Sequence, residues 1–204
     1  MLNLAVFVSG RGSNFISVFN NIRNGKIDAQ INFLVSDNKN CNAVAFAKEN
    51  RIPVLFVSEI AKEDYIGYTK LADLFNKKKI DLIVLAGFLK KIPDNFIEVF
   101  ENKIINIHPA LLPSFGGKGM YGMNVHRAVF EKSCKVSGAT IHFVNKIYDE
   151  GKIIFQKSVD ISDVNSAEEI AERVLKIEHE ILPFIVSKFS ENKIKICNNR
   201  VIIE

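Results

Sequence analysis

Two polar side chains, Asn106 and His108, interrupt a short apolar run near the middle of the chain. Residues 103–107 are mostly apolar and β-branched and are closely followed by Pro109, which predicts a buried strand that stops there. Residues two apart on a strand lie on the same face, so the amide and the imidazole are expected side by side. At the end of a strand in an α/β sheet, this pair suits the stabilisation of a carbonyl oxygen as it gains negative charge. The Asn-x-His pattern alone is equally compatible with a structural role, in which a buried Asn and His make their hydrogen bonds to backbone groups.

A carboxylate follows a second apolar run, at residues 140–144. Asp149, next to Gly151 in an Asp-x-Gly pattern, is expected in a loop that folds over the end of the sheet. Near His108 it would raise the pKa of the imidazole and keep the ring protonated, hence a better donor to an oxyanion. The same pattern is also common in ordinary turns. His126 and His142 are each interpreted as structural residues.

Residues 9–14, Ser-Gly-Arg-Gly-Ser-Asn, connect a predicted strand at residues 2–8 to a predicted helix. Glycines at positions 10 and 12 allow the backbone to approach a ligand, and the following helix offers free N–H groups. This arrangement suits a phosphate, although it equally describes a tight turn. It is not the dinucleotide fingerprint, because Phe15 occupies the place of the third glycine.

Strand and helix patterns alternate through the first half, with strands expected at 2–8, 30–35, 53–57 and 82–85 and helices at 43–49 and 65–76. The second half differs: a glycine-rich, mobile loop is expected at 114–122 and a helix at 125–130. Strands at 139–144 and 152–159 could pair antiparallel. A long helix is expected after a capping box at 166–169, then a short hairpin or strand. The prediction is an α/β fold with a Rossmann-like, mostly parallel sheet in the N-terminal half, antiparallel strands added in the C-terminal half, and helices on both faces.

The chain has 204 residues, 48% of them hydrophobic, and a net charge of +4. This length fits one domain, with a phosphate-binding half at about 1–100 and a catalytic half at about 101–204. The basic residues are dispersed, so nucleic acid is not indicated as a partner. Three distant cysteines suggest a reducing compartment without a zinc site. No apolar run is long enough for a signal peptide or a membrane span, which predicts a cytoplasmic protein.

The motifs together resemble those of glycinamide ribonucleotide formyltransferases, a family of formyl-folate-dependent enzymes. The resemblance covers essentially the whole chain and rests on residues 9–14, 85–88, 106–113, 119–122 with His126, 137–144 and Asp149-x-Gly151. The run Asn106-Ile-His-Pro-Ala-Leu-Leu-Pro113 marks the wider superfamily, and the Gly-Ser-Asn turn points to this member. The implied activity is formyl transfer from 10-formyltetrahydrofolate to the amine of glycinamide ribonucleotide in purine synthesis.

The resemblance also implies site residues. The catalytic residues would be Asn106, His108 as proton donor, and Asp149, which raises the pKa of the histidine. The ribonucleotide would contact Gly12, Ser13, Asn14 and Glu178. The folate would contact Asn106 and two segments, Leu89, Lys90, Lys91 and Ile92, and Asn145, Lys146, Ile147, Tyr148 and Asp149. No metal is implied, and the partners would be the two small-molecule substrates, with no nucleic acid or membrane, for a monomer or homodimer.

Two positions depart from the family pattern. An arginine of the third helix often contacts the folate in this family, and Tyr65 stands near that place here. Met-Arg often follows the Gly-Phe pair, where this chain has Leu89-Lys90, which keeps a positive charge but not a bidentate fork. From its own residues, the tripeptide 178–180, Glu-His-Glu, is interpreted as solvent-facing, with the alternative that one member points toward a ligand.

Three other functions remain open from the sequence. Methionyl-tRNA formyltransferases share the Leu-Leu-Pro core, but they carry a C-terminal RNA-binding domain for which 204 residues are expected to leave no room. Formyltetrahydrofolate hydrolases use the same chemistry with water, but typically have an N-terminal regulatory domain, whereas the core is expected to start here at residue 2. A non-catalytic phosphometabolite-binding protein is the third, and the presence of Asn106, His108 and Asp149 together argues against it.

Overall fold

The computed structural model describes residues 1–204 as two sheets and their covering helices. The main sheet has the strand order β3-β2-β1-β4-β5-β6-β7, and β8 and β9 form a separate pair. The strands are β1 (Leu2–Val8), β2 (Ala29–Ser36), β3 (Val54–Phe56), β4 (Leu82–Leu85), β5 (Ile104–His108), β6 (Val136–Phe143), β7 (Ile153–Asp160), β8 (Ile194–Cys197) and β9 (Arg200–Ile203). The helices are α1 (Ser13–Arg23), α2 (Asn42–Glu49), α3 (Tyr68–Lys77), α4 (Asp94–Val99), α5 (Met123–Glu131) and α6 (Ala167–Ser190).

The chain divides into two compact units, residues 1–105 and 106–204. In the first unit, β1 pairs in parallel with both β2 and β4, and β2 pairs in parallel with β3. Residues 4–8 of β1 are fully buried, as expected for a parallel strand covered on both faces. Phe7 of β1 contacts the rings of Phe75 from α3 and Phe96 from α4 at centroid distances of 6.2 and 6.3 Å. These rings anchor α3 and α4 to the sheet.

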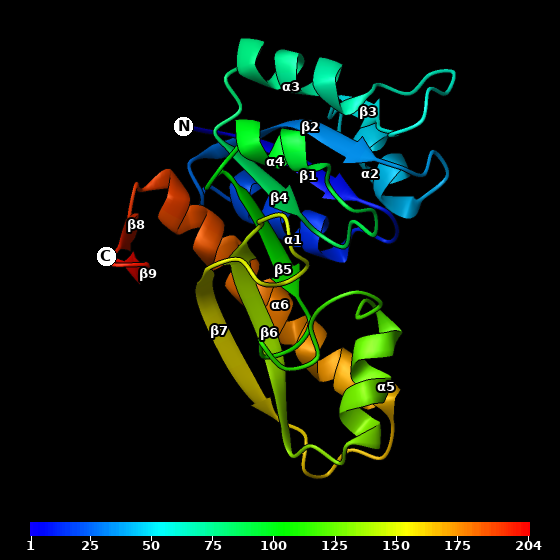
Figure 1. Ribbon diagram of the computed structural model, residues 1–204, viewed down its shortest axis with the longest axis vertical. Helices are drawn as coiled ribbons and strands as arrows, with labels where there is room; N and C mark the ends of the chain where they lie inside the picture. The colour runs from blue at the N-terminus through cyan, green and yellow to red at the C-terminus, as the bar shows by residue number, and fades with distance from the viewer. The chain divides into compact units, whose positions relative to one another are not determined.

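In the second unit, β6 and β7 pair antiparallel along their whole length. The long helix α6 packs against both strands and also against α5, as Figure 1 shows in orange and light green. Ser166 caps α6, because its hydroxyl accepts a hydrogen bond from the Glu169 N–H. The Glu169 carboxylate accepts from the N–H of Asn165 instead of completing the expected bond to Ser166. The C-terminal hairpin β8–β9 also forms as a two-stranded antiparallel pair.

The predicted fold class is confirmed, and so is the antiparallel pairing in the second half. Two details of the prediction were wrong. Helix α3 begins at Tyr68, so Tyr65 lies in the preceding loop, where Gly67 in extended conformation delays the helix. Helix α4 was missed because its six residues are too few to show a helical period. None of the helices has the length and apolar content needed to cross a membrane.

Candidate active site

The imidazole of His108, the last residue of β5, is held by two groups of the second unit. Its Nε2 lies 2.8 Å from the carbonyl oxygen of Phe115, in the loop after β5. A carbonyl only accepts, so Nε2 carries the proton and donates it. The other ring nitrogen, Nδ1, lies 3.6 Å from Oδ2 of Asp149. The ring is therefore oriented by the backbone on one side and faces a carboxylate on the other.

Asp149 lies in the loop between β6 and β7, and its side chain is only 12% exposed. Its Oδ2 accepts a hydrogen bond of 2.8 Å from the N–H of Gly117, and its Oδ1 lies 3.6 Å from Nε2 of His142. Burial alone raises the pKa of the Asp149 carboxyl, but His142, His108 and the Gly117 N–H together lower it below its ordinary value. Asp149 is thus held as a carboxylate between two imidazoles.

The pKa of His108 departs from the sequence-based expectation. Burial lowers it, while Asp149 and the Phe115 carbonyl raise it, and the net direction is downward. The carboxylate was predicted correctly to favour the protonated ring, but the expectation overlooked the desolvation of a side chain that is 3% exposed. His108 therefore gains a proton less readily than a free imidazole.

Asn106 contacts a residue that the sequence analysis took to be structural. Its Nδ2 lies 3.1 Å from Nε2 of His142, which is 2% exposed on β6. The His142 Nδ1 in turn lies 2.8 Å from the carbonyl oxygen of Phe143. The side chains of Asn106, His142, Asp149 and His108 form one continuous series of polar neighbours. A signal was available in the sequence: Thr140 and His142 are two polar residues at strand spacing inside an apolar run.

Thr140 and Gln156 fix the loop that leaves β5. The Thr140 hydroxyl donates to the carbonyl oxygen of Ala110 at 2.6 Å and accepts from the N–H of Leu112 at 3.0 Å. The Gln156 amide donates to the Leu112 carbonyl oxygen at 2.9 Å. These bonds satisfy buried backbone groups of a segment that has no regular structure. They hold the chain directly after His108 against β6 and β7.

In the first unit, the predicted phosphate turn caps α1. Gly12 has φ +74° and ψ 26°, a left-handed conformation that glycine adopts without strain, and no side chain caps the helix. A Cβ on Gly12 would come within 2.5 Å of the Ala43 Cβ, so the close packing also requires glycine. Ser13 is half-buried and Asn14 is buried at the first turn of α1, which contains no acidic residue. The N–H groups and the helix dipole favour an anion here.

The segments predicted to contact folate are mostly exposed. Leu89, Lys90 and Lys91 are exposed, whereas Ile92 is buried in the core of the first unit. The Ser9 hydroxyl accepts from the Leu89 N–H at 2.9 Å, and the Ser9 N–H donates to the Gly87 carbonyl at 3.0 Å, so this segment is tied to the phosphate turn.

In the second unit, residues 145–148 are exposed, with Ile147 and Tyr148 offering apolar surface. Glu178 on α6 is only 8% exposed, so the prediction of a solvent-facing side chain was wrong for this residue. Its place in the helical period, between the buried Val174 and Ile181, turns it toward the body of the unit. No group of three or more His, Cys, Asp or Glu side chains suited to a metal ion is present.

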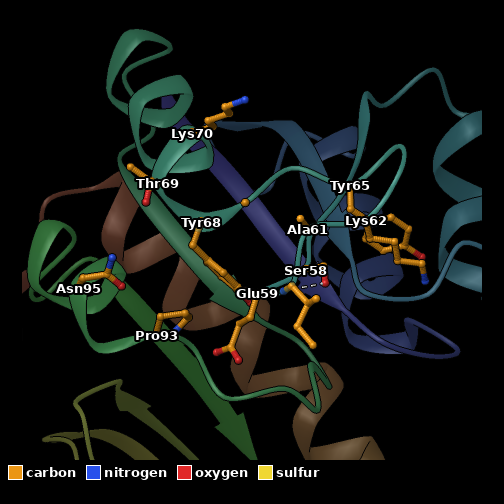
Figure 2. A pocket seen from close by; sticks show the side chains of 12 residues that line it. Ser58, Glu59, Ala61, Lys62, Tyr65, Tyr68, Thr69, Lys70, Pro93 and Asn95 are labelled. Carbon is orange, nitrogen blue, oxygen red and sulfur yellow. Dashed lines mark hydrogen bonds between the residues drawn. The ribbon is translucent and has the colours of Figure 1, made fainter.

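A hollow of about 650 Å³ lies in the first unit, but it contains none of the predicted site residues. The residues that line it come from the loop after β3, the start of α3 and the start of α4, as Figure 2 shows. Tyr65 lies on its rim, where the Lys62 ammonium is 4.3 Å from the ring centroid and the hydroxyl donates to the Asp37 carbonyl oxygen at 3.5 Å. Tyr65, which stands near the place of the family arginine, is therefore engaged within its own unit.

Comparison with known proteins gives consistent matches. The profile of the formyl transferase family matches residues 2–186. The chain is 43% identical to the chloroplastic phosphoribosylglycinamide formyltransferase of Arabidopsis thaliana over 94% of its own length and 66% of that protein, so it spans slightly less than two thirds of this relative. It is 32% identical to the phosphoribosylglycinamide formyltransferase of Haemophilus influenzae, over 98% of this chain and 92% of that protein. The crystal structure of glycinamide ribonucleotide transformylase 1 from Symbiobacterium toebii superposes with a TM-score of 0.88 at 30% identity, covering 100% of this chain and 94% of that chain.

The glycine two residues after Asp149 fixes the loop that carries the carboxylate. A Cβ on Gly151 would lie 1.6 Å from the carbonyl oxygen of Phe143, a backbone atom that cannot yield without moving β6. We expect Gly151→Ala to lower the free energy of unfolding by about 1–3 kcal/mol, as overpacking commonly does. Urea denaturation measures this. Gly67→Ala is the matched control, because no atom lies within 4 Å of its Cβ position and its φ is −76°. Equal stability of the two variants would contradict the packing argument.

His126 on α5 makes stability depend on pH. The residue is 5% exposed, and its Nδ1 has no hydrogen-bond partner. Burial, and to a smaller extent the nearby His108, lower its pKa to about 4. The unfolded chain therefore binds a proton between pH 6.5 and 4 that the folded chain does not, so stability falls as the pH falls through this window. The lowered pKa of His108 acts in the same direction. We expect His126→Gln to reduce the difference in unfolding free energy between pH 7 and pH 5, measured by urea denaturation; an unchanged difference would show that His126 titrates normally.

Proposed function

The chain belongs to the formyl transferase family, and we propose that it transfers the formyl group of 10-formyltetrahydrofolate to the amine of 5′-phosphoribosylglycinamide, in de novo purine biosynthesis. The observation that carries this proposal is the series of polar neighbours Asn106, His142, Asp149 and His108, from β5, β6 and the loop after β6. The phosphoribosylglycinamide formyltransferases named among its relatives support the choice of acceptor. We also infer a reducing, cytoplasmic setting, which the free state of all three cysteines supports.

In the proposed reaction, the acceptor amine attacks the formyl carbon and a tetrahedral intermediate places negative charge on the former carbonyl oxygen. The Asn106 amide donates a hydrogen bond to this oxygen, and the protonated His108 ring donates a second one with the Nε2–H that it otherwise gives to the Phe115 carbonyl. Removal of one such donor commonly raises a barrier by about 2.7–4 kcal/mol. Because the site is buried, these donors act in a medium where charge interactions are stronger than in water.

The protons and bonds balance without a covalent enzyme intermediate. A new bond joins the amine nitrogen to the formyl carbon, and the bond from that carbon to the folate nitrogen breaks. The amine nitrogen loses one proton and the folate nitrogen gains one. Asp149 takes the amine proton, directly or through water, while His108 gives its proton to the folate nitrogen. The proton on Asp149 then returns to His108, which restores both groups. Burial lowers the pKa of His108, and the negative charge that develops on the intermediate favours its protonated form.

We propose binding residues for each of the two substrates. We propose Gly12, Ser13 and Asn14 for the phosphate of the ribonucleotide, supported by the uncapped start of α1. Glu178, a buried carboxylate, would contact the glycinamide part. The exposed segments 89–91 and 145–148, with Asn106 and Asp149, would contact the folate, with Ile92 contributing backbone only because its side chain is buried.

Hydrolysis of formyltetrahydrofolate, with water as the acceptor, is the second candidate, because the same polar series would serve it. The phosphate turn of the first unit favours the transferase, since a hydrolase has no phosphorylated acceptor to bind.

The decisive test follows folate deformylation by the purified protein with and without glycinamide ribonucleotide. We expect deformylation to require the ribonucleotide and formylglycinamide ribonucleotide to accumulate. We expect His108→Ala to lower kcat by about 10²–10⁴-fold, the range of general acid–base contributions. Equal rates without the acceptor would identify a hydrolase and refute the proposed acceptor. An active His108→Ala variant would remove His108 from the mechanism.

The phosphate site is tested separately by Asn14→Ala. We expect KM for the ribonucleotide to rise about tenfold or more, as for loss of a hydrogen bond to a charged group worth about 1.5–3 kcal/mol, while KM for the folate is unchanged. Asn20→Ala, on the exposed face of the same helix, is the control. Steady-state kinetics measures both variants, and an unchanged KM for the ribonucleotide would place its phosphate elsewhere.

A further inference from the structure

His142 makes a hydrogen bond at each ring nitrogen although it is almost completely buried. Its Nδ1 lies 2.8 Å from the Phe143 carbonyl oxygen, and its Nε2 lies 3.1 Å from the Asn106 Nδ2. The side chain is 2% exposed, so no solvent molecule substitutes freely for either partner. None of the roles proposed above is assigned to this ring.

The two contacts determine which ring nitrogen carries the proton. The Phe143 carbonyl only accepts, so Nδ1 must carry the hydrogen. In a neutral ring Nε2 then has a lone pair and must accept. The group that faces it has to be a donor, and the Asn106 carboxamide can meet this requirement only with its NH2 end.

The nearer polar neighbour of Nε2 is the Asn106 amide. Nε2 lies within hydrogen-bond range of the Asn106 nitrogen, at 3.1 Å, but at 3.6 Å from Oδ1 of Asp149, beyond that range. The short contact of Asp149 is made by its other oxygen, Oδ2, which accepts from the Gly117 N–H at 2.8 Å.

We propose that His142 is a positioning residue for formyl transfer, which fixes the rotation of the Asn106 carboxamide. This inference rests on the proposed function. With one N–H of Asn106 bonded to His142, the second N–H is available to the oxygen that becomes negative. Rotation of the carboxamide by 180° would present its oxygen there, an acceptor facing a developing anion. His142 excludes that orientation because its own lone pair would then face the Asn106 oxygen.

Two substitutions separate this role from simple packing. His142→Leu keeps an apolar side chain of similar size and removes the acceptor, whereas His142→Gln retains an acceptor at nearly the position of Nε2 and does not titrate. We expect His142→Leu to lower kcat by about tenfold to a hundredfold, below the roughly 10²–10³-fold loss on removing an oxyanion donor itself. KM for both substrates should stay within about twofold, and His142→Gln should recover most of the rate.

A double-mutant cycle with Asn106→Ala tests the route of the effect. If His142 acts through Asn106, His142→Leu should cause no further loss of kcat once the amide is absent. If the role is purely structural, His142→Leu should lower kcat by the same factor in the wild-type protein and in the Asn106→Ala variant. That result would overturn the proposal. Melting temperatures of the four proteins show whether any loss reflects unfolding.

A readout independent of activity separates failure of this inference from failure of the proposed function. Long-range ¹⁵N–¹H spectra of the wild-type protein report which ring nitrogen of His142 is protonated, and we expect Nδ1. A protonated Nε2 in an active transferase would refute the positioning role alone. The expected Nδ1–H form in a protein without formyl transfer would refute the proposed function, and with it the catalytic consequence drawn for His142.

Discussion

Asp149 is a carboxylate in a mostly buried position, and a charge there is stable only where nearby groups replace the water it has lost. The Gly117 N–H supplies a short bond, and two imidazoles approach within 3.6 Å. The same carboxylate therefore fixes the loop after β5, faces the ring of His108 and lies beside His142. The two buried imidazoles beside it make their hydrogen bonds to other partners, which are the Phe115 and Phe143 carbonyl oxygens and the Asn106 amide.

Burial and charge act in opposite directions on the two members of the central pair. Desolvation lowers the pKa of His108 and raises that of Asp149, while their mutual attraction does the reverse. For His108 the effect of burial on the pKa is the larger one, and for Asp149 the effect of the neighbouring groups is larger than that of burial. The site therefore places a carboxylate beside a ring that gains a proton less readily than a free imidazole. Such a site responds to new negative charge by taking up a proton, which is the behaviour an acyl transfer requires of its proton donor.

The sequence predicted the fold class, most strands, and the places of Asn106, His108 and Asp149, because these depend on local periodicity and on residues that interrupt it. It did not predict how buried each side chain is. The protonation of His108, the burial of Glu178 and the contact between His142 and Asn106 all depend on packing between segments distant in the chain. His142 was dismissed because a lone histidine in an apolar strand carries no local sign of its partner. The six-residue α4 was missed for a different reason, its length.

Ser9 joins two segments of the first unit that were assigned to different substrates. Its hydroxyl accepts a hydrogen bond from the Leu89 N–H, and its own N–H donates one to the Gly87 carbonyl oxygen. The turn that begins at Ser9 leads into α1. A ligand that binds the turn and favours this arrangement also stabilises the conformation of residues 87–89. Thermodynamic linkage makes such an effect mutual, so a ligand held by residues 89–91 strengthens binding at the turn by the same factor. One serine thus couples the conformations of two segments that we propose for different substrates.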